Sequence, residues 1–124
     1  MNVVIDTHAL LWLLNSDKRL SHKAKNSIKI ASIVFIPSIV LLELFYLLEK
    51  KSKRELFTIT LKAIRNDNRY VVIALDSAVV EEVFKHQLPV EMHDRIIIAT
   101  ASLLRIPLVT KDKTIHQLYR KTIW

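Results

Sequence analysis

The sequence contains no cysteine and no glycine among its 124 residues, and each absence excludes a class of function. Without cysteine there is no disulfide framework, no thiolate zinc site and no cysteine nucleophile. Without glycine there is no Walker A loop, no G-x-G-x-x-G dinucleotide fingerprint and no G-x-S-x-G nucleophile elbow. Turns must use other residues, and Asn15, Asn66 and Asn68 are the expected left-handed positions.

Long hydrophobic runs are also missing. The apolar stretch over residues 33–48 is interrupted by Pro37, Ser38 and Glu43, so we expect no membrane-spanning segment. The first residues, MNVVID, lack the basic segment and cleavage region of a signal peptide. We therefore expect a cytoplasmic protein with no membrane partner.

Positive charge is in excess over negative charge. The chain carries a formal charge of +7 at pH 7 and has a pI near 9.8, which favours a polyanionic partner such as RNA, DNA or an acidic protein. With 51% hydrophobic residues the chain should be globular. Its 124 residues are enough for one domain, residues 1–124, and too few for two.

Short β-branched runs alternate with longer segments of helical period, which is typical of an α/β fold with a parallel sheet. Strands are predicted near residues 2–5, 33–36, 70–74, 107–109 and 121–124. Helices are predicted near residues 7–14, 21–31, 38–51, 54–66, 76–86, 93–105 and 113–118.

Glu43 is the only charged residue in the apolar run over residues 39–48. On a helix it lies beside Ile39, Val40 and Leu47, on the side that is expected to pack. An unpaired carboxylate in such a place is costly and tends to stay protonated. Its partner is a bound cation, or a Lys or Arg in a buried ion pair, unless the side chain turns to solvent.

Three aspartates lie where an α/β fold could bring them to the same place. Asp6 directly follows the first predicted strand, Asp94 opens a long helix, and Asp112 comes just after the fourth strand. Each of the three could instead be a helix N-cap. Asp76 also follows a strand and opens a helix, but nothing else near it indicates chemistry, so we interpret it as a cap.

The four acids offer only oxygen ligands, which Mg²⁺ and Mn²⁺ prefer, whereas Zn²⁺ favours nitrogen or sulfur. Such a cluster repels itself unless one or two divalent ions are present. No histidine has a second histidine at ligand spacing, so none is predicted to bind the metal, and His116 is interpreted as a surface residue. The acids predicted to form a metal-dependent site acting on a phosphodiester are Asp6, Glu43, Asp94 and Asp112.

Four segments carry a family pattern. They are IDTHALLW at residues 5–12, Pro37-Ser38 followed by Glu43, HDRIIIATA at residues 93–101, and PLVTKD at residues 107–112. In this order they resemble the PIN-domain ribonucleases, and among those the VapC-type toxins of toxin-antitoxin pairs. The likeness covers essentially the whole chain. One departure is that such toxins often have D-P-F-D before the arginine of the third segment, whereas this chain reads VEMHDR.

The resemblance implies a three-layer α/β/α fold with a central parallel sheet of four to five strands, in which the first and fourth strands are adjacent. It also implies cleavage of single-stranded or looped RNA by an endonuclease that depends on Mg²⁺ or Mn²⁺. In that hypothesis Asp6, Glu43 and Asp94 hold the main metal, and Asp112 completes the site directly or through water.

The resemblance further implies a cognate antitoxin protein and a homodimer. An apolar helix near the amino terminus could serve these contacts or could equally form core, through Leu10, Leu11, Leu13 and Leu14. Basic residues that could track an RNA backbone, or could form a solvated face, are Lys23, Lys25, Lys29, Lys50, Lys51, Lys53 and Arg54.

Three further residues have secondary roles in this hypothesis. The hydroxyls of Thr7 and Thr110 could orient water or phosphate, or could merely cap or turn the chain. Arg95, next to Asp94, could contact a phosphate or pair with a carboxylate.

Two other classes of α/β protein also carry an aspartate after the first strand. A receiver-type phosphoacceptor domain needs paired acids after the first strand, and a haloacid-dehalogenase-type phosphatase needs an acid at position 8, where this chain has His8. The stronger alternative is a non-catalytic PIN-like module that binds RNA or protein. The presence of all four acids argues against it.

Overall fold

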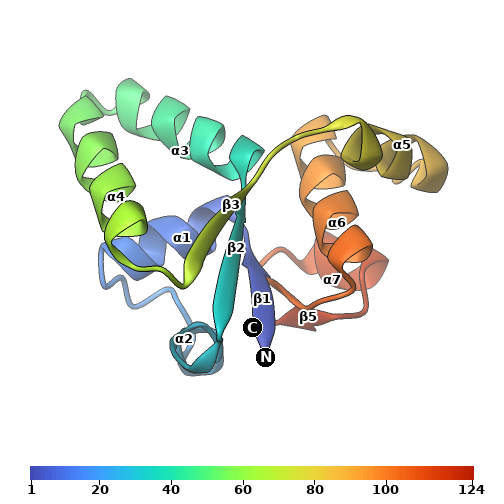
Figure 1. Ribbon diagram of the computed structural model, residues 1–124, viewed down its shortest axis with the longest axis horizontal. Helices are drawn as coiled ribbons and strands as arrows, with labels where there is room; N and C mark the ends of the chain where they lie inside the picture. Colours follow the sequence, from blue (N-terminus) through green and yellow to red (C-terminus); the bar gives the residue numbers. More distant parts are fainter.

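All five strands of the central sheet run parallel, in the order β3-β2-β1-β4-β5 (Figure 1). The computed structural model describes residues 1–124. The strands are β1 (Asn2–Ile5), β2 (Ile33–Pro37), β3 (Tyr70–Ile73), β4 (Leu108–Val109) and β5 (Thr122–Ile123). The helices are α1 (Thr7–Leu14), α2 (His22–Ile30), α3 (Ser38–Lys50), α4 (Arg54–Asn66), α5 (Ser77–His86), α6 (Met92–Leu104) and α7 (Lys113–Leu118).

Strand β1 lies at the centre of the sheet because it is apolar on both faces. Val3, Val4 and Ile5 have no exposed surface, as expected for a parallel strand that is covered on both sides. β1 pairs with β2 on one side and with β4 on the other. The strand order therefore reverses between β1 and β4, which confirms the predicted adjacency of the first and fourth strands.

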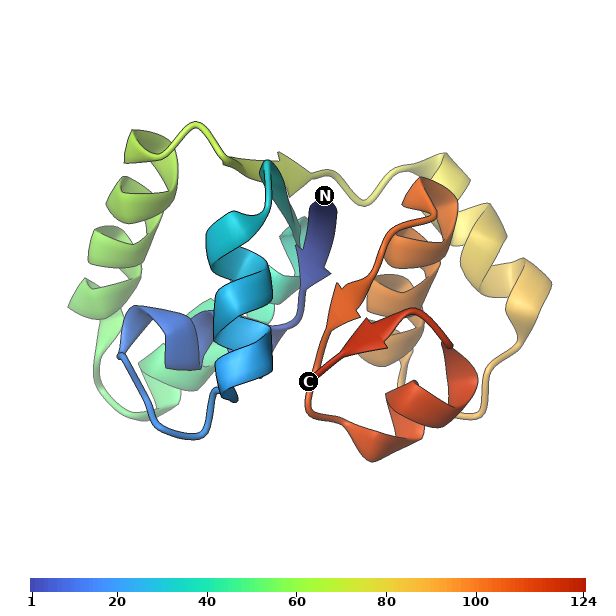
Figure 2. The same ribbon diagram turned by 90° about the horizontal axis from the view of Figure 1, so that it is seen from below.

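The helices form a layer on each side of the sheet, and the predicted three-layer α/β/α architecture is confirmed. Helices α1 to α4 lie on one side of the sheet, and α5 to α7 lie on the other (Figure 2). This division follows from right-handed crossovers, because the chain moves one way from β1 to β3 and the opposite way from β3 to β5. None of the helices is both long and apolar enough to cross a lipid bilayer.

The leucines of α1 belong to the core. Leu10 is fully buried, and Leu11, Leu13 and Leu14 are partly buried and pack against the same cluster of apolar side chains. Of the two roles considered for this helix face, the structure therefore shows core packing.

The prediction that asparagines take the left-handed positions was wrong. The residues with positive φ are Ser16, Ser52, Gln87 and Arg105. Arg105 ends α6, and the chain turns there so that the Arg105 and Ile106 amides donate to the carbonyls of Ser102 and Ala101. A left-handed residue is needed where the helix ends, whichever residue the sequence has there. Because this chain has no glycine, a residue with a side chain takes that conformation.

The prediction that His116 is a surface residue was also wrong. Its Nε2 lies 2.7 Å from the carbonyl oxygen of Thr110, and its Nδ1 lies 2.8 Å from Oγ1 of Thr122. The half-buried ring thereby joins the end of β4 to β5. A histidine on a short terminal helix gives no sequence signal for such a bridge.

The cost of the left-handed turn at Arg105 is testable. We expect Arg105→Gly to raise the free energy of unfolding by about 0.5 to 1 kcal/mol. Glycine removes the Cβ clash of the left-handed conformation, and this gain exceeds the additional chain entropy that glycine loses on folding. The measurement is urea unfolding followed by circular dichroism. Lys62→Gly, within α4, is the control and should lower stability by about 1 kcal/mol. A loss of stability in Arg105→Gly would contradict the interpretation.

Candidate functional site

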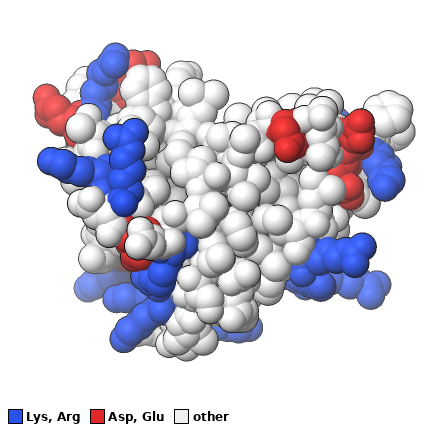
Figure 3. Space-filling view, in the orientation of Figure 1, with Lys and Arg blue, Asp and Glu red and all other residues white.

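A pocket at the carboxyl ends of β1 and β4 contains all four acids that the sequence predicts. Its volume is about 390 Å³, and seen from one side the molecule is hollowed between the α3–α4 arm and the α5–α6 arm (Figure 3). The lining residues are Asp6, Thr7, His8, Trp12, Glu43, His93, Asp94, Ile97, Lys111, Asp112 and Ile115. The acids come from four separate segments of the chain, which the fold brings together.

Asp6 is both a helix cap and part of the pocket. Its Oδ1 accepts a hydrogen bond of 2.9 Å from the Ala9 amide at the start of α1, and its own amide donates to the Val109 carbonyl of β4. Only 9% of the residue is exposed. Burial raises the pKa of the Asp6 carboxyl, and hydrogen bonding by Thr110 and by the Ala9 amide opposes this effect.

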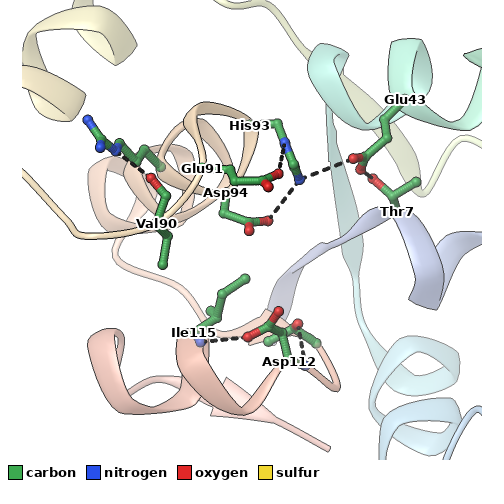
Figure 4. A network of polar contacts seen from close by, with 10 residues as sticks. Thr7, Glu43, Val90, Glu91, His93, Asp94, Asp112 and Ile115 are labelled. Carbon is green, nitrogen blue, oxygen red and sulfur yellow. Dashed lines mark hydrogen bonds and ion pairs between the residues drawn. The ribbon is translucent and has the colours of Figure 1, made fainter.

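Glu43 turns toward the pocket and pairs with neither lysine nor arginine. One carboxylate oxygen accepts a hydrogen bond from the Thr7 hydroxyl, and the other lies 3.2 Å from Nε2 of His93 (Figure 4). The side chain is 26% exposed. The acid in the middle of an apolar helix is therefore held toward the carboxylates of the neighbouring segments, which was the arrangement expected of a cation ligand.

Asp94 lies in the first turn of α6, so it is not the N-cap of that helix. Burial raises the pKa of its carboxyl, His93 lowers it, and the negative charges of Asp112, Glu43 and Glu91 raise it further. The carboxylates are close enough to repel one another. Such mutual repulsion is what a site built for a cation requires.

His93 was not predicted as a site residue, yet its ring lies between two of the acids (Figure 4). Nε2 is 3.2 Å from Glu43 and 3.4 Å from Asp94, and Nδ1 is 3.5 Å from Glu91. The usable signal was its position beside Asp94 in the first turn of a helix whose amino-terminal end faces the pocket. Lys111 and Trp12 also line the pocket without having been predicted.

Asp112 is exposed and caps α7. Its Oδ1 accepts a 3.0 Å hydrogen bond from the Ile115 amide, and its own amide donates to Oγ1 of Thr110. The capping role and the pocket position therefore coexist here, as they do for Asp6. The two readings that the sequence left open for these aspartates do not exclude each other.

The structure places Thr7 in the lining of the pocket, but not Thr110 or Arg95. Thr7 lines the pocket and holds Glu43, while Thr110 is fully buried and supports Asp112 from behind. Arg95 lies outside the pocket, where its Nε donates to the Val90 carbonyl at 2.8 Å, and it pairs with no carboxylate. Adjacent residues on a helix point about 100° apart, which carries Arg95 away from the side that Asp94 faces.

The donor set fits a hard divalent cation, because every acidic ligand atom is a carboxylate oxygen and the buried charges need compensation. As the side chains lie, no three acidic or histidine residues form a closed group around one point. The residues that could hold a metal are Asp6, Glu43, Asp94 and Asp112.

A model of the PIN domain matches residues 3–121, and the chain belongs to this family. The chain is similar to VapBC2 of Rickettsia felis bound to a promoter DNA fragment, with 19% identity, a TM-score of 0.77, and 98% of this chain and 96% of that chain covered. It is similar to Mycobacterium tuberculosis VapC20, a toxin that cleaves the sarcin-ricin loop, with 16% identity, a TM-score of 0.73, and 94% and 95% covered.

DNA-bound VapBC of Salmonella typhimurium is another similar structure, with 19% identity, a TM-score of 0.73, and 94% of this chain and 91% of that chain covered. At these identities the likeness establishes the fold. A comparison with curated protein sequences gave no match.

The repulsion among the acids predicts opposite effects of one substitution with and without metal. Near pH 8, where an ordinary histidine is neutral, metal-free Asp94→Asn should unfold at a higher temperature than the parent, because one partly buried negative charge that repels its neighbours is gone. Mn²⁺ at about 100 times its Kd should stabilise the parent by about 2.7 kcal/mol and the variant much less. Differential scanning fluorimetry measures both shifts.

Asp76→Asn is the matched control for this experiment, because Asp76 caps α5 far from the pocket through its bond to the Val79 amide. It should respond to Mn²⁺ as the parent does. Equal Mn²⁺ stabilisation of the parent and Asp94→Asn would contradict a metal site at Asp94.

Proposed function

We propose that this protein is an endoribonuclease that depends on Mg²⁺ or Mn²⁺ and hydrolyses phosphodiester bonds of RNA, as the toxin of a toxin-antitoxin pair. The observation that carries the proposal is the convergence of four carboxylates from four segments on one pocket, although burial and, to a smaller extent, repulsion by the neighbouring acids raise the pKa of Asp94. Membership of the PIN family and the likeness to VapC20 support ribonuclease activity.

In this proposal Asp6, Glu43 and Asp94 hold the main metal, and Asp112 completes the site directly or through water. When bound, the metal lowers the pKa of water and offsets negative charge on the phosphate. The protein contributes position. The helix cap and Thr110 hold the Asp6 carboxylate, and the Thr7 hydroxyl and the His93 ring contact the two oxygens of Glu43, so both carboxylates have fixed positions in the lining of the pocket.

Water attacks the phosphorus in line, the bond from phosphorus to the 3'-oxygen breaks, and the proton lost by the water is balanced by the proton that the 3'-oxygen takes up, so the products carry 5'-phosphate and 3'-hydroxyl ends. No covalent intermediate is needed, and no histidine is required as a base. The formal charge of +7 favours the approach of a polyanion such as RNA, although the pocket itself is acidic. A bound cation would offset the negative charge of the carboxylates and so lower the repulsion that a phosphate meets there.

The likeness to VapBC complexes supports a cognate antitoxin as protein partner, and we include a homodimer in the proposal. Cytoplasmic RNA is the proposed target.

The test is to incubate purified protein, freed of any partner, with total cellular RNA, with and without Mg²⁺ or Mn²⁺, and to sequence new 5'-phosphate ends. We expect cuts that depend on metal and that fall roughly 100-fold or more in Asp94→Asn, because one centre of electrostatic stabilisation is lost. Asp76→Asn, which makes the same chemical change outside the pocket, should cleave like the parent.

Cleavage that survives in Asp94→Asn would place the activity elsewhere. RNA binding by the parent protein with no cleavage even when Mg²⁺ or Mn²⁺ is present would instead favour a non-catalytic PIN-like module that binds RNA or protein.

A further inference from the structure

Trp12 is a buried indole surrounded by basic groups. Only 7% of the residue is exposed, yet the guanidinium carbon of Arg19 lies 5.0 Å and the ammonium of Lys111 lies 5.6 Å from its ring centroid. The His8 ring lies 5.5 Å away. The Arg19 and Lys111 distances are within the range of cation–π attraction, and the His8 ring adds an aromatic contact.

The indole N–H of Trp12 has no hydrogen-bond partner, although it is buried. A buried tryptophan N–H normally finds an acceptor, and leaving it unpaired lowers stability. The ring instead contacts basic groups through its faces, and one of these groups, Lys111, lines the carboxylate pocket.

A second pocket lies on the other side of Trp12, which lines both. Its volume is about 440 Å³, and it is lined by Trp12, Leu13, Ser16, Asp17, Lys18, Leu20, Ser21, His22 and Lys25. The one acid there, Asp17, forms an ion pair of 2.7 Å with Arg19. Neither Lys18 nor Lys25 forms an ion pair, so the positive charge of this pocket is uncompensated.

Lys111 connects the two pockets electrostatically. It is the only lysine or arginine that lines the carboxylate pocket, and it forms no ion pair with the acids there. Its ammonium lies against Trp12 instead. Positive charge therefore begins at the edge of the acidic pocket and continues past Trp12 to Lys18 and Lys25.

We propose that the RNA strand cleaved in the carboxylate pocket continues past Trp12 into the second pocket, where Lys18 and Lys25 bind backbone phosphates, and that Lys111 binds a phosphate between the two. This inference rests on the proposed function, because it assigns the path of the substrate of that site. The ligand class is a single-stranded polyanion, bound through its phosphates with no sequence readout.

The other basic cluster of the chain is a poorer candidate. It lies at the α3–α4 junction and contains Lys50, Lys51, Lys53 and Arg54, none of which lines either pocket. Arg54 pairs with Glu49 at 2.9 Å, and Lys50 lies 5.1 Å from the Tyr46 ring centroid. Lys50 and Lys51 are both exposed, so Lys50→Ala/Lys51→Ala is a control variant with the same change of net charge as Lys18→Ala/Lys25→Ala.

The test measures binding of a short fluorescein-labelled single-stranded RNA by anisotropy over a range of salt concentrations, in the full-length Asp94→Asn background with Mn²⁺ absent. Lys18→Ala/Lys25→Ala should lower the magnitude of the slope of log K against log salt by about 1.4, which is about 0.7 for each lost phosphate contact. Lys50→Ala/Lys51→Ala should leave the slope unchanged.

Lys111→Gln tests the connecting residue in the cleaving enzyme. It should raise KM for the RNA, whereas the Mn²⁺-induced rise in melting temperature should persist or increase, because the variant removes a positive charge that repels the cation. A cooperative melting transition of each metal-free lysine variant would show that it still folds.

The outcomes separate this inference from the proposed function. Equal slopes for the two double variants, or a loss confined to Lys50→Ala/Lys51→Ala, would overturn the path while metal-dependent cleavage stands. An absence of RNA binding and of cleavage by every protein would overturn both.

Discussion

The structure depends on one strand that is buried on both faces. β1 has a paired neighbour on each side and a helical layer above and below, so the residue that follows it cannot leave the sheet toward solvent. Asp6 therefore lies at the carboxyl end of β1, beside β4, where the strand order reverses. This is the position at which open α/β sheets bind ligands, because the helices that follow neighbouring strands diverge there.

A second constraint is set by the acids themselves. Clustering them destabilises the metal-free protein, since burial and like charge both disfavour ionised Asp94. The fold offsets part of this cost locally. Asp6 and Asp112 cap helices, and Glu43 accepts a hydroxyl hydrogen bond, so three of the four carboxylates also stabilise the protein around them. These contacts hold three of the four carboxylates in place independently of any cation.

The sequence predicted most of the fold because the strands are continuous apolar runs and the helices begin at capping residues, as Asp76 and Asp112 do. It predicted the four acids because each lies at the end of a strand or in an apolar helix. It did not predict the ring of His93 between Glu43 and Asp94, because no local pattern marks a contact between α3 and α6.

The remaining misses have the same physical origin. Arg95 was placed by its position next to Asp94, but the helix rotates it out of the pocket. The left-handed turn at Arg105 depends on where α6 must end to let the chain enter β4, which a propensity for asparagine does not report. Helix geometry decided the direction of Arg95, whereas tertiary contacts decided the turn at Arg105, and a single sequence position carries little information about either.

The arrangement of charge explains how one small domain could both attract and cleave a polyanion. A uniformly basic surface would hold RNA without a cation site, and an acidic pocket alone would repel it. Here the acids are confined to one pocket, and the single ammonium in its lining is held by an indole face, away from ion pairs with them. Had Lys111 paired with Asp6 or Asp112, it would have neutralised one of the proposed metal-binding carboxylates and lost its own capacity for phosphate. The face of Trp12 thereby holds the Lys111 ammonium in the same cavity as the carboxylates without an ion pair between them.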